Sequence, residues 1–179
     1  MRRVAHSLVG AGALTLGIPA QAQPADAQHA TVSATLRAED AYAAMNAAFG
    51  QDTLENGDFM WKDGTTRVDR LLLILSDQML FVYANGEMVG VSTVSTGRPG
   101  HETRPGSFRI LAKYRTYFSR KYDNAPMPYM QQITTYGVAF HAGPMPGYPA
   151  SHGCIRLPAK FAANLFAVTK IGTAVEIAE

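Results

Sequence analysis

The residues best suited to covalent chemistry lie together in the segment HAGPMPGYPASHGCIRLP, residues 141–158. It holds Cys154, the only cysteine of the chain, with His141 and His152 close by in sequence. A thiol becomes a good nucleophile when it ionises, and a neighbouring histidine promotes that ionisation. Acyl transfer also needs hydrogen-bond donors where negative charge develops on the attacked carbonyl oxygen. The backbone amides of Gly153 and Cys154 are candidates for these donors, because they lie on a turn flanked by glycines and prolines.

The spacing does not decide which histidine serves the thiol. His152 is two residues before Cys154, and their side chains share a face if the segment is extended. His141 ends a predicted strand, and the loop that follows can bring its ring back to the sulfur. Both histidines therefore remain candidates for the general base at this stage.

The N-terminus predicts export. Arg2 and Arg3 precede a short apolar run at residues 8–18, and Ala20-Gln21-Ala22 fits the small-x-small pattern of a cleavage site. We expect residues 1–22 to be a signal peptide, which places the mature protein in the periplasm. The apolar run is too short for a transmembrane helix and no cysteine follows it, so we expect no membrane anchor.

Charge and cysteine content restrict the class of protein. Removing residues 1–22 takes away two arginines and no acids, so the formal charge falls from +2 to 2 − 2 = 0. A neutral chain is not a general polyanion binder, and we expect no nucleic-acid partner. The remaining residues suffice for one domain with its own core, which we expect to be a monomer. A single cysteine allows no internal disulfide, and in an exported protein it is either an incidental buried thiol or a reactive one.

The N-terminal part of the mature chain predicts little regular structure. Residues 23–34 are rich in Ala, Gln, Ser and Thr and suggest a mobile leader. Residues 35–49 contain good helix formers and end at Gly50, which predicts one helix. A polar loop to Gly64 follows, so residues 23–66 are expected to comprise leader, helix and loop before a domain at residues 67–179.

Short apolar runs separated by turn residues predict a mostly β domain from residue 67 onward. Asn85-Gly86 between two such runs is a strong hairpin signal. A helix is expected at residues 158–170, where Phe161, Leu165 and Val168 fall on one face. The expected strands are 70–76, 79–84, 87–96, 107–114, 136–141 and 173–178.

The motif SHGCIRLP, with FHAG upstream, resembles the signature of the L,D-transpeptidases, whose catalytic domain is of the YkuD type. The resemblance covers about residues 70–178 and implies a β-sandwich with mixed sheets and one or two helices. Two features depart from the family pattern. The gap from His141 to Ser151 is shorter than in many members, which implies a small covering loop and an open site. The usual Thr-Pro-Thr-Gly loop reads TRPG at residues 103–106.

The resemblance assigns roles by position. It makes Cys154 the nucleophile and His141 the general base. It places His152, Gly153 and Ser151 in the segment that forms the oxyanion hole and orients the site.

Two further residues are expected to touch substrate. Arg156 matches a position that shapes the site, and it can either pair with a substrate carboxylate or brace the turn from behind. Tyr148 lies in the loop over the site. The stretch from Arg98 to Lys121 is strongly basic, which suits a substrate with carboxylates but also suits a solvated surface.

The activity implied by the resemblance is acyl transfer on peptidoglycan stem peptides, which act as donor and acceptor, without a cofactor. The cysteine attacks the carbonyl of the diaminopimelate residue at stem position three and releases D-Ala. The amine of another diaminopimelate gives a 3-3 cross-link, and that of L-Ala at position one gives a 1-3 link. A free D-amino acid gives exchange, and water makes the protein a carboxypeptidase.

Three other interpretations use the same residues. Two histidines and one cysteine can bind zinc with His101 as a fourth ligand, but the paired ligand spacing of zinc sites is missing. A wall-binding module without turnover would not need both Cys154 and His141. A cysteine hydrolase that trims or cuts cross-links shares every catalytic residue, and the sequence does not separate it from a transpeptidase.

Overall fold

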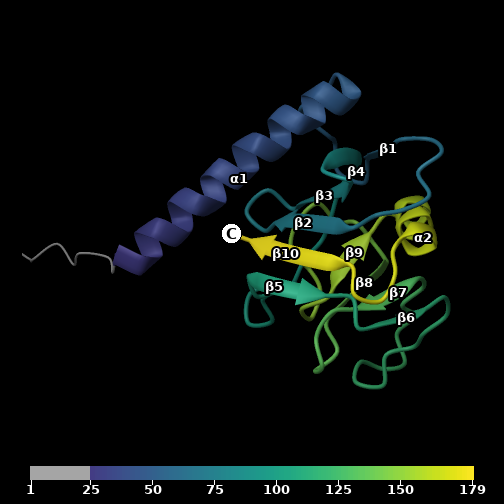
Figure 1. Cartoon of the computed structure of the whole chain (residues 1–179). Helices are drawn as coiled ribbons and strands as arrows, with labels where there is room; N and C mark the ends of the chain where they lie inside the picture. Colours follow the sequence, from purple (N-terminus) through teal and green to yellow (C-terminus); the bar gives the residue numbers. More distant parts are fainter. Residues whose placement is uncertain (1–24) are drawn as a thin grey trace, which may run out of the picture.

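The computed structural model describes residues 25–179, with side chains described from Arg37 onward. The expected signal peptide at residues 1–22 lies outside this range. Within it the chain forms two helices and ten strands (Figure 1). Neither helix in the described part is both long enough and apolar enough to cross a membrane.

The strands form two sheets, and each sheet mixes parallel and antiparallel pairs. The larger sheet has the order β1-β4-β3-β2-β10-β5, in which only β10 and β2 run parallel. Its members are β1 (Phe59–Trp61), β2 (Arg70–Ile74), β3 (Met79–Ala84), β4 (Glu87–Thr93), β5 (Gly106–Arg109) and β10 (Ala174–Ala178). The smaller sheet has the order β6-β7-β8-β9, with β8 and β9 parallel. Its members are β6 (Ala112–Tyr114), β7 (Met130–Gln132), β8 (Ala139–Ala142) and β9 (Ile155–Leu157). The predicted mostly β fold with mixed sheets and one or two helices is therefore confirmed, and the described residues contain two helices.

One apolar core joins the two sheets. Alternate residues of β2 and β3 point into it from the larger sheet, and alternate residues of β8 and β9 point into it from the smaller one. Helix α2 (Ala159–Val168) adds Phe161 and Leu165, both fully buried. Its C-terminal carbonyls at Phe166 and Thr169 accept hydrogen bonds from the Lys113 ammonium of β6, which ties the helix to the smaller sheet.

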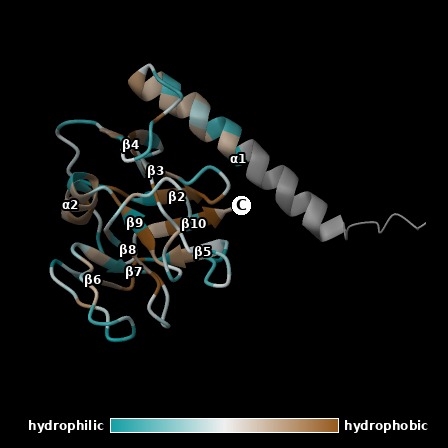
Figure 2. Cartoon of the chain, turned by 180° about the vertical axis from the view of Figure 1, so that it is seen from behind, coloured by the Kyte–Doolittle hydropathy of each residue, from teal (hydrophilic) through white to brown (hydrophobic). Residues whose placement is uncertain are grey.

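Helix α1 (Ala25–Phe49) lies against the other face of the larger sheet (Figure 1). Ala41 and Met45 are buried there among residues of β2, β3 and β4. The Tyr42 hydroxyl donates to the Asp77 carboxylate at 2.9 Å, and Arg37 pairs with Glu176 of β10 at 2.9 Å. Figure 2 shows the apolar strands β2 and β10 at the centre of the molecule, between α1 and the smaller sheet.

The predicted β3–β4 hairpin is confirmed. Asn85 and Gly86 connect the strands with φ of 52° and 85°, as a two-residue turn of this kind requires.

Other expectations were wrong in their boundaries. Helix α1 begins at Ala25 rather than at residue 35, so most of the predicted leader is helical. The predicted strand 107–114 is two strands in different sheets. Ile110 donates to Thr173 beside β10, whereas Leu111 donates to Gln132 in β7, so the chain passes between the sheets at this peptide bond. Strands β1, β7 and β9 have three residues each and were not predicted, because such short runs show no periodicity.

The packing of α1 leads to a stability prediction. Met45→Ala removes a fully buried side chain between α1 and the larger sheet. We expect it to lower the free energy of unfolding by about 2–5 kcal/mol, measured by urea denaturation. Met45→Leu conserves the volume and should cost under about 1.5 kcal/mol. Equal stability of Met45→Ala and the unsubstituted protein would show that α1 does not contribute to the fold.

Candidate active site

The register of β8 against β9 brings His141 and Cys154 to one face of the smaller sheet. Phe140 pairs with Ile155, and both are fully buried in the core between the sheets. Side chains alternate along a strand, so His141 and its partner Arg156 project from the opposite face. Cys154 lies two residues before Arg156 and shares that face. His141 of β8 and the only thiol, one residue before β9, therefore lie on the same side of the smaller sheet, away from the core between the sheets.

Two hydroxyl groups hold the turn that carries Cys154. The Ser151 hydroxyl donates to the carbonyl of Cys154 at 2.6 Å and accepts from the amide of Gly153 at 3.0 Å. The buried Thr103 hydroxyl donates to the carbonyl of Gly153 at 3.0 Å and accepts from the amide of Gly97 at 2.9 Å. Gly153 has a φ of +108°, which a residue with a side chain rarely adopts.

Backbone pairing fixes the same turn to residues 95–98. Ser95 exchanges two hydrogen bonds with Arg156, and the amide of Arg98 donates to the carbonyl of Ser151 at 3.0 Å. Gly97 is required in this segment, because a Cβ there would lie 2.0 Å from the carbonyl oxygen of His101. Thr103 was not among the predicted site residues. Its only signal was its place at the start of TRPG.

His141 is a neutral imidazole with one free nitrogen. Its Nδ1 lies 2.9 Å from the carbonyl oxygen of Ala142, which can only accept, so Nδ1 carries the proton and Nε2 has a free lone pair. Burial lowers the pKa of His141, and the positive charge of Arg156 lowers it further, while the bond to Ala142 acts in the opposite direction. The ring is therefore uncharged, and Nε2 is the nitrogen that can accept a proton.

His152 is held differently and is exposed. Its Nε2 lies 3.0 Å from a guanidinium nitrogen of Arg98, which can only donate, so this nitrogen serves as the acceptor. The ring stacks on Tyr122 at 4.5 Å and meets the edge of His101 at 4.9 Å. Desolvation and then the charge of Arg98 lower the pKa of His152. The lone pair on His152 Nε2 already accepts a hydrogen bond from Arg98, so the geometry favours His141 over His152 as the base.

Cys154 lies in a largely apolar setting. Its sulfur is 3.8 Å from the carbonyl oxygen of Gly137, and its side chain packs against a small cluster. That cluster consists of Tyr117, Met127, Met130 and Ala139. Burial raises the pKa of the Cys154 thiol, while a backbone hydrogen bond from Ala139 and the charge of Arg156 lower it to a smaller extent. The balance leaves a protonated thiol that needs a base.

Only one of the two predicted oxyanion donors is free. The Gly153 amide is used by the Ser151 hydroxyl. In a parallel pair, only every second residue of β9 directs its amide toward β8. The Arg156 amide points the other way and donates to the carbonyl of Ser95. Cys154 is in phase with Arg156, and within residues 25–179 its amide has no acceptor. An oxyanion hole at this turn remains a prediction and would depend on the Cys154 amide.

Arg156 and Tyr148 both border this face. The guanidinium of Arg156 makes no ion pair or hydrogen bond within the described side chains, and its stem runs over Gly143, where a Cβ would lie 3.1 Å from it. Tyr148 is 62% exposed, and its carbonyl accepts from the Ser95 hydroxyl at 2.8 Å. Both can contact a ligand, and their predicted substrate-binding roles stay predictions.

A hairpin at residues 115–129 covers the site. Tyr129 donates to the carbonyl of Arg115, and Met127 donates to that of Tyr117, which brings Tyr117 and Met127 onto Cys154. The same hairpin carries Tyr122 to His152. The expectation of an open site considered only the loop that follows His141 and did not include this hairpin.

The alternative zinc site does not gain support. Within the described residues there is no group of three or more His, Cys, Asp or Glu side chains arranged to hold a metal ion. His101 contacts the ring of His152 and joins no cluster with Cys154.

Comparison with known proteins identifies the family. Residues 68–177 match the L,D-transpeptidase catalytic domain, YkuD, so the chain belongs to this cysteine-dependent family. An L,D-transpeptidase structure from Stackebrandtia nassauensis is 26% identical with a TM-score of 0.58, and the match covers 66% of this chain and 58% of that one. One from Mycobacterium tuberculosis is 26% identical with a TM-score of 0.59, covering 63% and 57% respectively. The chain thus spans less than two thirds of these relatives. None of the curated protein sequences matches it significantly.

The two pKa shifts predict how thiol reactivity depends on pH. The raised pKa of Cys154 keeps the thiol protonated at neutral pH, and the lowered pKa of His141 keeps the imidazole uncharged. Alkylation by iodoacetamide should therefore rise with pH to a midpoint above that of free cysteine, about 8.5. Mass spectrometry reports this one site, because the chain has one cysteine. A reactive plateau between about pH 5 and 7 would indicate a preformed thiolate–imidazolium pair instead.

The support of the turn by Thr103 can be tested with an isosteric change. Thr103→Val removes both hydrogen bonds of the hydroxyl and leaves the Gly97 amide buried without a partner. We expect the free energy of unfolding to fall by about 1–3 kcal/mol in urea denaturation. Thr103→Ser keeps the hydroxyl and should lose less. If the two variants are equally stable, the hydroxyl is not what holds this turn.

Proposed function

We propose that this member of the L,D-transpeptidase family is an exported peptidoglycan cross-linking enzyme, with Cys154 as nucleophile and His141 as general base. One observation carries the proposal. The β8–β9 register places the only thiol on the same face as a neutral imidazole whose Nε2 is free. The basic residues around this face suit stem peptides, which carry carboxylates.

The first half-reaction forms a thioester. His141 Nε2 takes the thiol proton as Sγ of Cys154 bonds to the carbonyl carbon of the diaminopimelate residue at stem position three. The oxyanion is stabilised by the Cys154 amide, a donor that contributes about 2.7–4 kcal/mol in comparable sites. When the tetrahedral intermediate collapses, the bond to D-Ala breaks and the imidazolium returns its proton to the leaving amine.

The second half-reaction transfers the acyl group. An acceptor amine attacks the thioester carbon, His141 takes its proton, and the C–S bond breaks to restore the thiol. The side-chain amine of a second diaminopimelate gives a 3-3 cross-link, and L-Ala at position one gives a 1-3 link. Arg156 and Tyr148 lie where they can orient the peptides. The signal-peptide pattern at residues 1–22 supports a periplasmic location.

Hydrolysis and exchange use the same residues. Water in place of the amine makes the protein an L,D-carboxypeptidase or endopeptidase, and a free D-amino acid gives exchange. A wall-binding module without turnover accounts less well for the paired Cys154 and His141. The products distinguish these activities.

Substitutions test the assigned roles. Cys154→Ala should abolish the covalent acyl adduct and D-Ala release, because no other thiol exists. His141→Ala should reduce turnover by about 10²–10⁴-fold through loss of the base. His152→Ala should be milder, because its Nε2 is already bonded to Arg98. Release of D-Ala by Cys154→Ala would disprove the mechanism. A larger loss in His152→Ala than in His141→Ala would reassign the base.

A further inference from the structure

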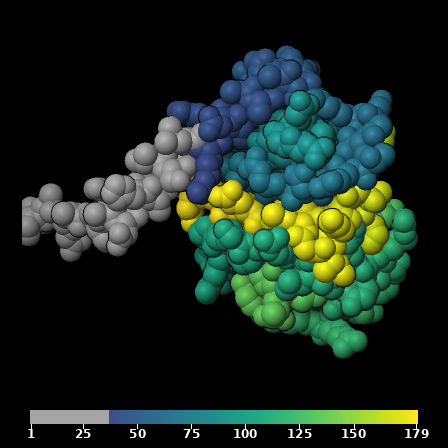
Figure 3. Space-filling view, in the orientation of Figure 1, coloured from purple at the N-terminus to yellow at the C-terminus, as the bar shows by residue number. Residues whose placement is uncertain are grey.

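A groove runs beside β5, at the free edge of the larger sheet. It encloses about 650 Å³ between β5 and the turn at residues 134–136, with β10 contributing to its lining. A smaller cavity of about 40 Å³ shares Phe108, Ile133 and Tyr136 with it and extends to Thr103 and Val138. Figure 3 shows the C-terminal residues (yellow) at the surface of this face, with the teal segment that includes β5 beside them.

The edge of β5 presents free backbone groups to this groove. In an antiparallel pair, alternate residues bond to the neighbouring strand and the others point away from it. The amide of Ile110 donates to the carbonyl of Thr173, next to β10, so the backbone groups of Phe108, two residues earlier, also face β10. The amides and carbonyls of Ser107 and Arg109 therefore point away from the sheet. Within residues 25–179 these outward groups have no hydrogen-bond partner. An unpaired edge of this kind accepts an extended peptide as an added strand.

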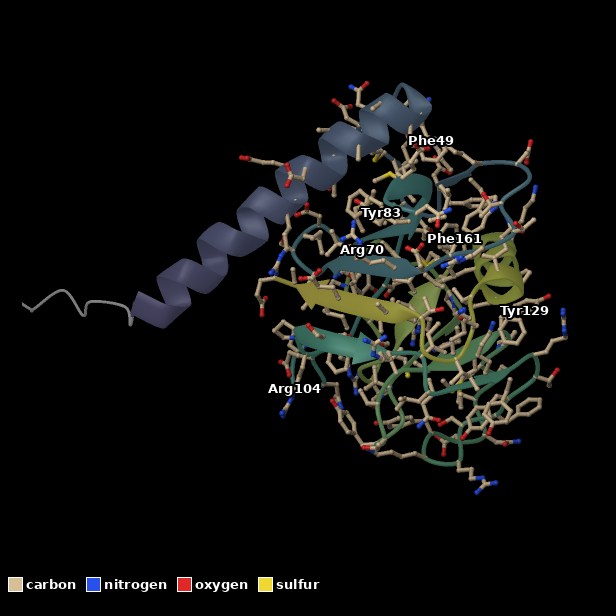
Figure 4. All side chains as sticks on the ribbon, in the orientation of Figure 1. Phe49, Arg70, Tyr83, Arg104, Tyr129 and Phe161 are labelled. Carbon is tan, nitrogen blue, oxygen red and sulfur yellow. The ribbon has the colours of Figure 1, made fainter. Side chains whose placement is uncertain are left out.

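The side chains of the groove suit a peptide with carboxylates. Arg70 and Arg109 line it, and Arg104 lines the smaller cavity. Figure 4 shows Arg70 and Arg104 on opposite sides of β10 and β5. Glu176 is paired with Arg37, and Glu102 accepts a hydrogen bond from the Gly100 amide. Two exposed apolar side chains, Leu111 at 44% and Tyr136 at 68%, add contact area.

The groove leads toward the nucleophile. Thr103, in the smaller cavity, donates to the carbonyl of Gly153. Val138 is close enough that a Cβ on Gly153 would lie 3.8 Å from its methyl group. Gly137, between Tyr136 and Val138, places its carbonyl 3.8 Å from the sulfur of Cys154. The smaller cavity therefore ends at Val138 and Thr103, next to the turn that carries Cys154.

We propose that this groove binds the acceptor stem peptide as an extended strand along β5, with the peptide's carboxylates facing Arg104 and Arg109. The inference rests on the proposed function, because a transpeptidase must hold a second peptide while the first is bound to the thiol. Ser107 and Arg109 bond to the acceptor main chain, and its amine reaches the thioester past Gly137. Four residues of β5 span roughly 10–13 Å, enough for a peptide of stem length.

A second copy of the chain is a less suitable occupant. Pairing two β5 edges would bring the arginines of both copies into one groove, and like charges across an interface disfavour association. An acidic peptide has the complementary charge.

The backbone bond can be removed with a single substitution. Ser107→Pro eliminates the outward amide, and proline is tolerated at an edge strand where that amide faces away from the sheet. Ser107→Ala is the matched control that keeps the amide. We expect acylation of Cys154 by a tetrapeptide donor to stay within about twofold in both variants, while Ser107→Pro alone raises the KM for the acceptor muropeptide about tenfold. Equal acceptor KM values in the two variants would overturn the proposal.

Further measurements cover the remaining outcomes. If Ser107→Pro does not fold, Arg109→Glu against Arg109→Lys tests the same groove, with a raised acceptor KM expected only for Arg109→Glu. Light scattering that shows a dimer dissociated by Ser107→Pro would assign the edge to a second copy instead. If the unsubstituted protein forms no acyl adduct, the proposed function fails by itself. Peptide binding in the groove is then tested by calorimetric titration of a muropeptide into Cys154→Ala protein, with and without Ser107→Pro. Equal affinities of the two proteins would overturn the proposed peptide site.

Discussion

The parallel pairing of β8 with β9 is the constraint on which the site depends. Since the register sends Phe140 and Ile155 into the core, His141 and Cys154 must project from the other face. A slip of one residue would bury one of them in the core and expose a core side chain. The apolar core between the sheets thus enforces the geometry of the site. The hydroxyls of Ser151 and Thr103 then fix the turn that leads into β9, through hydrogen bonds to its carbonyls.

Hydrogen-bond chemistry then separates the two histidines. The carbonyl of Ala142 binds the Nδ1–H of His141 and leaves the lone pair on Nε2 free. The guanidinium of Arg98 occupies the lone pair on Nε2 of His152, so of these two rings only His141 has a free lone pair. Burial lowers the pKa of His141 and raises that of Cys154, so it favours the neutral form of both groups. The positive charge of Arg156 lowers the pKa of the Cys154 thiol, which favours the thiolate, and it also lowers the pKa of His141, which keeps that ring uncharged. These pKa directions disfavour a stored thiolate–imidazolium pair and agree with the proposed proton transfer from Cys154 to His141 during attack.

The parts of the fold and of the site that depend on short stretches of sequence were predictable. The Asn85-Gly86 turn and the motif around Cys154 are short stretches whose residue types determine their conformation. The parts that the sequence did not predict depend on distant partners. Thr103 acts through Gly153, fifty residues away in sequence, and the passage between sheets at Ile110 depends on Thr173 and Gln132. Three-residue strands are too short for periodicity, and the hairpin 115–129 covers Cys154 only because β7 and β8 pair.

Acyl transfer through Cys154 can be followed by mass spectrometry of the intact protein and its products after incubation with disaccharide-tetrapeptide muropeptides. We expect a transient acyl adduct on Cys154, release of D-Ala, and a cross-linked muropeptide dimer. Fragmentation of the dimer identifies the acceptor amine as that of stem position three or position one. Shortened monomers alone would assign a carboxypeptidase. The absence of both adduct and product would contradict the assignment of Cys154 as an acyl-transfer nucleophile acting on these peptides.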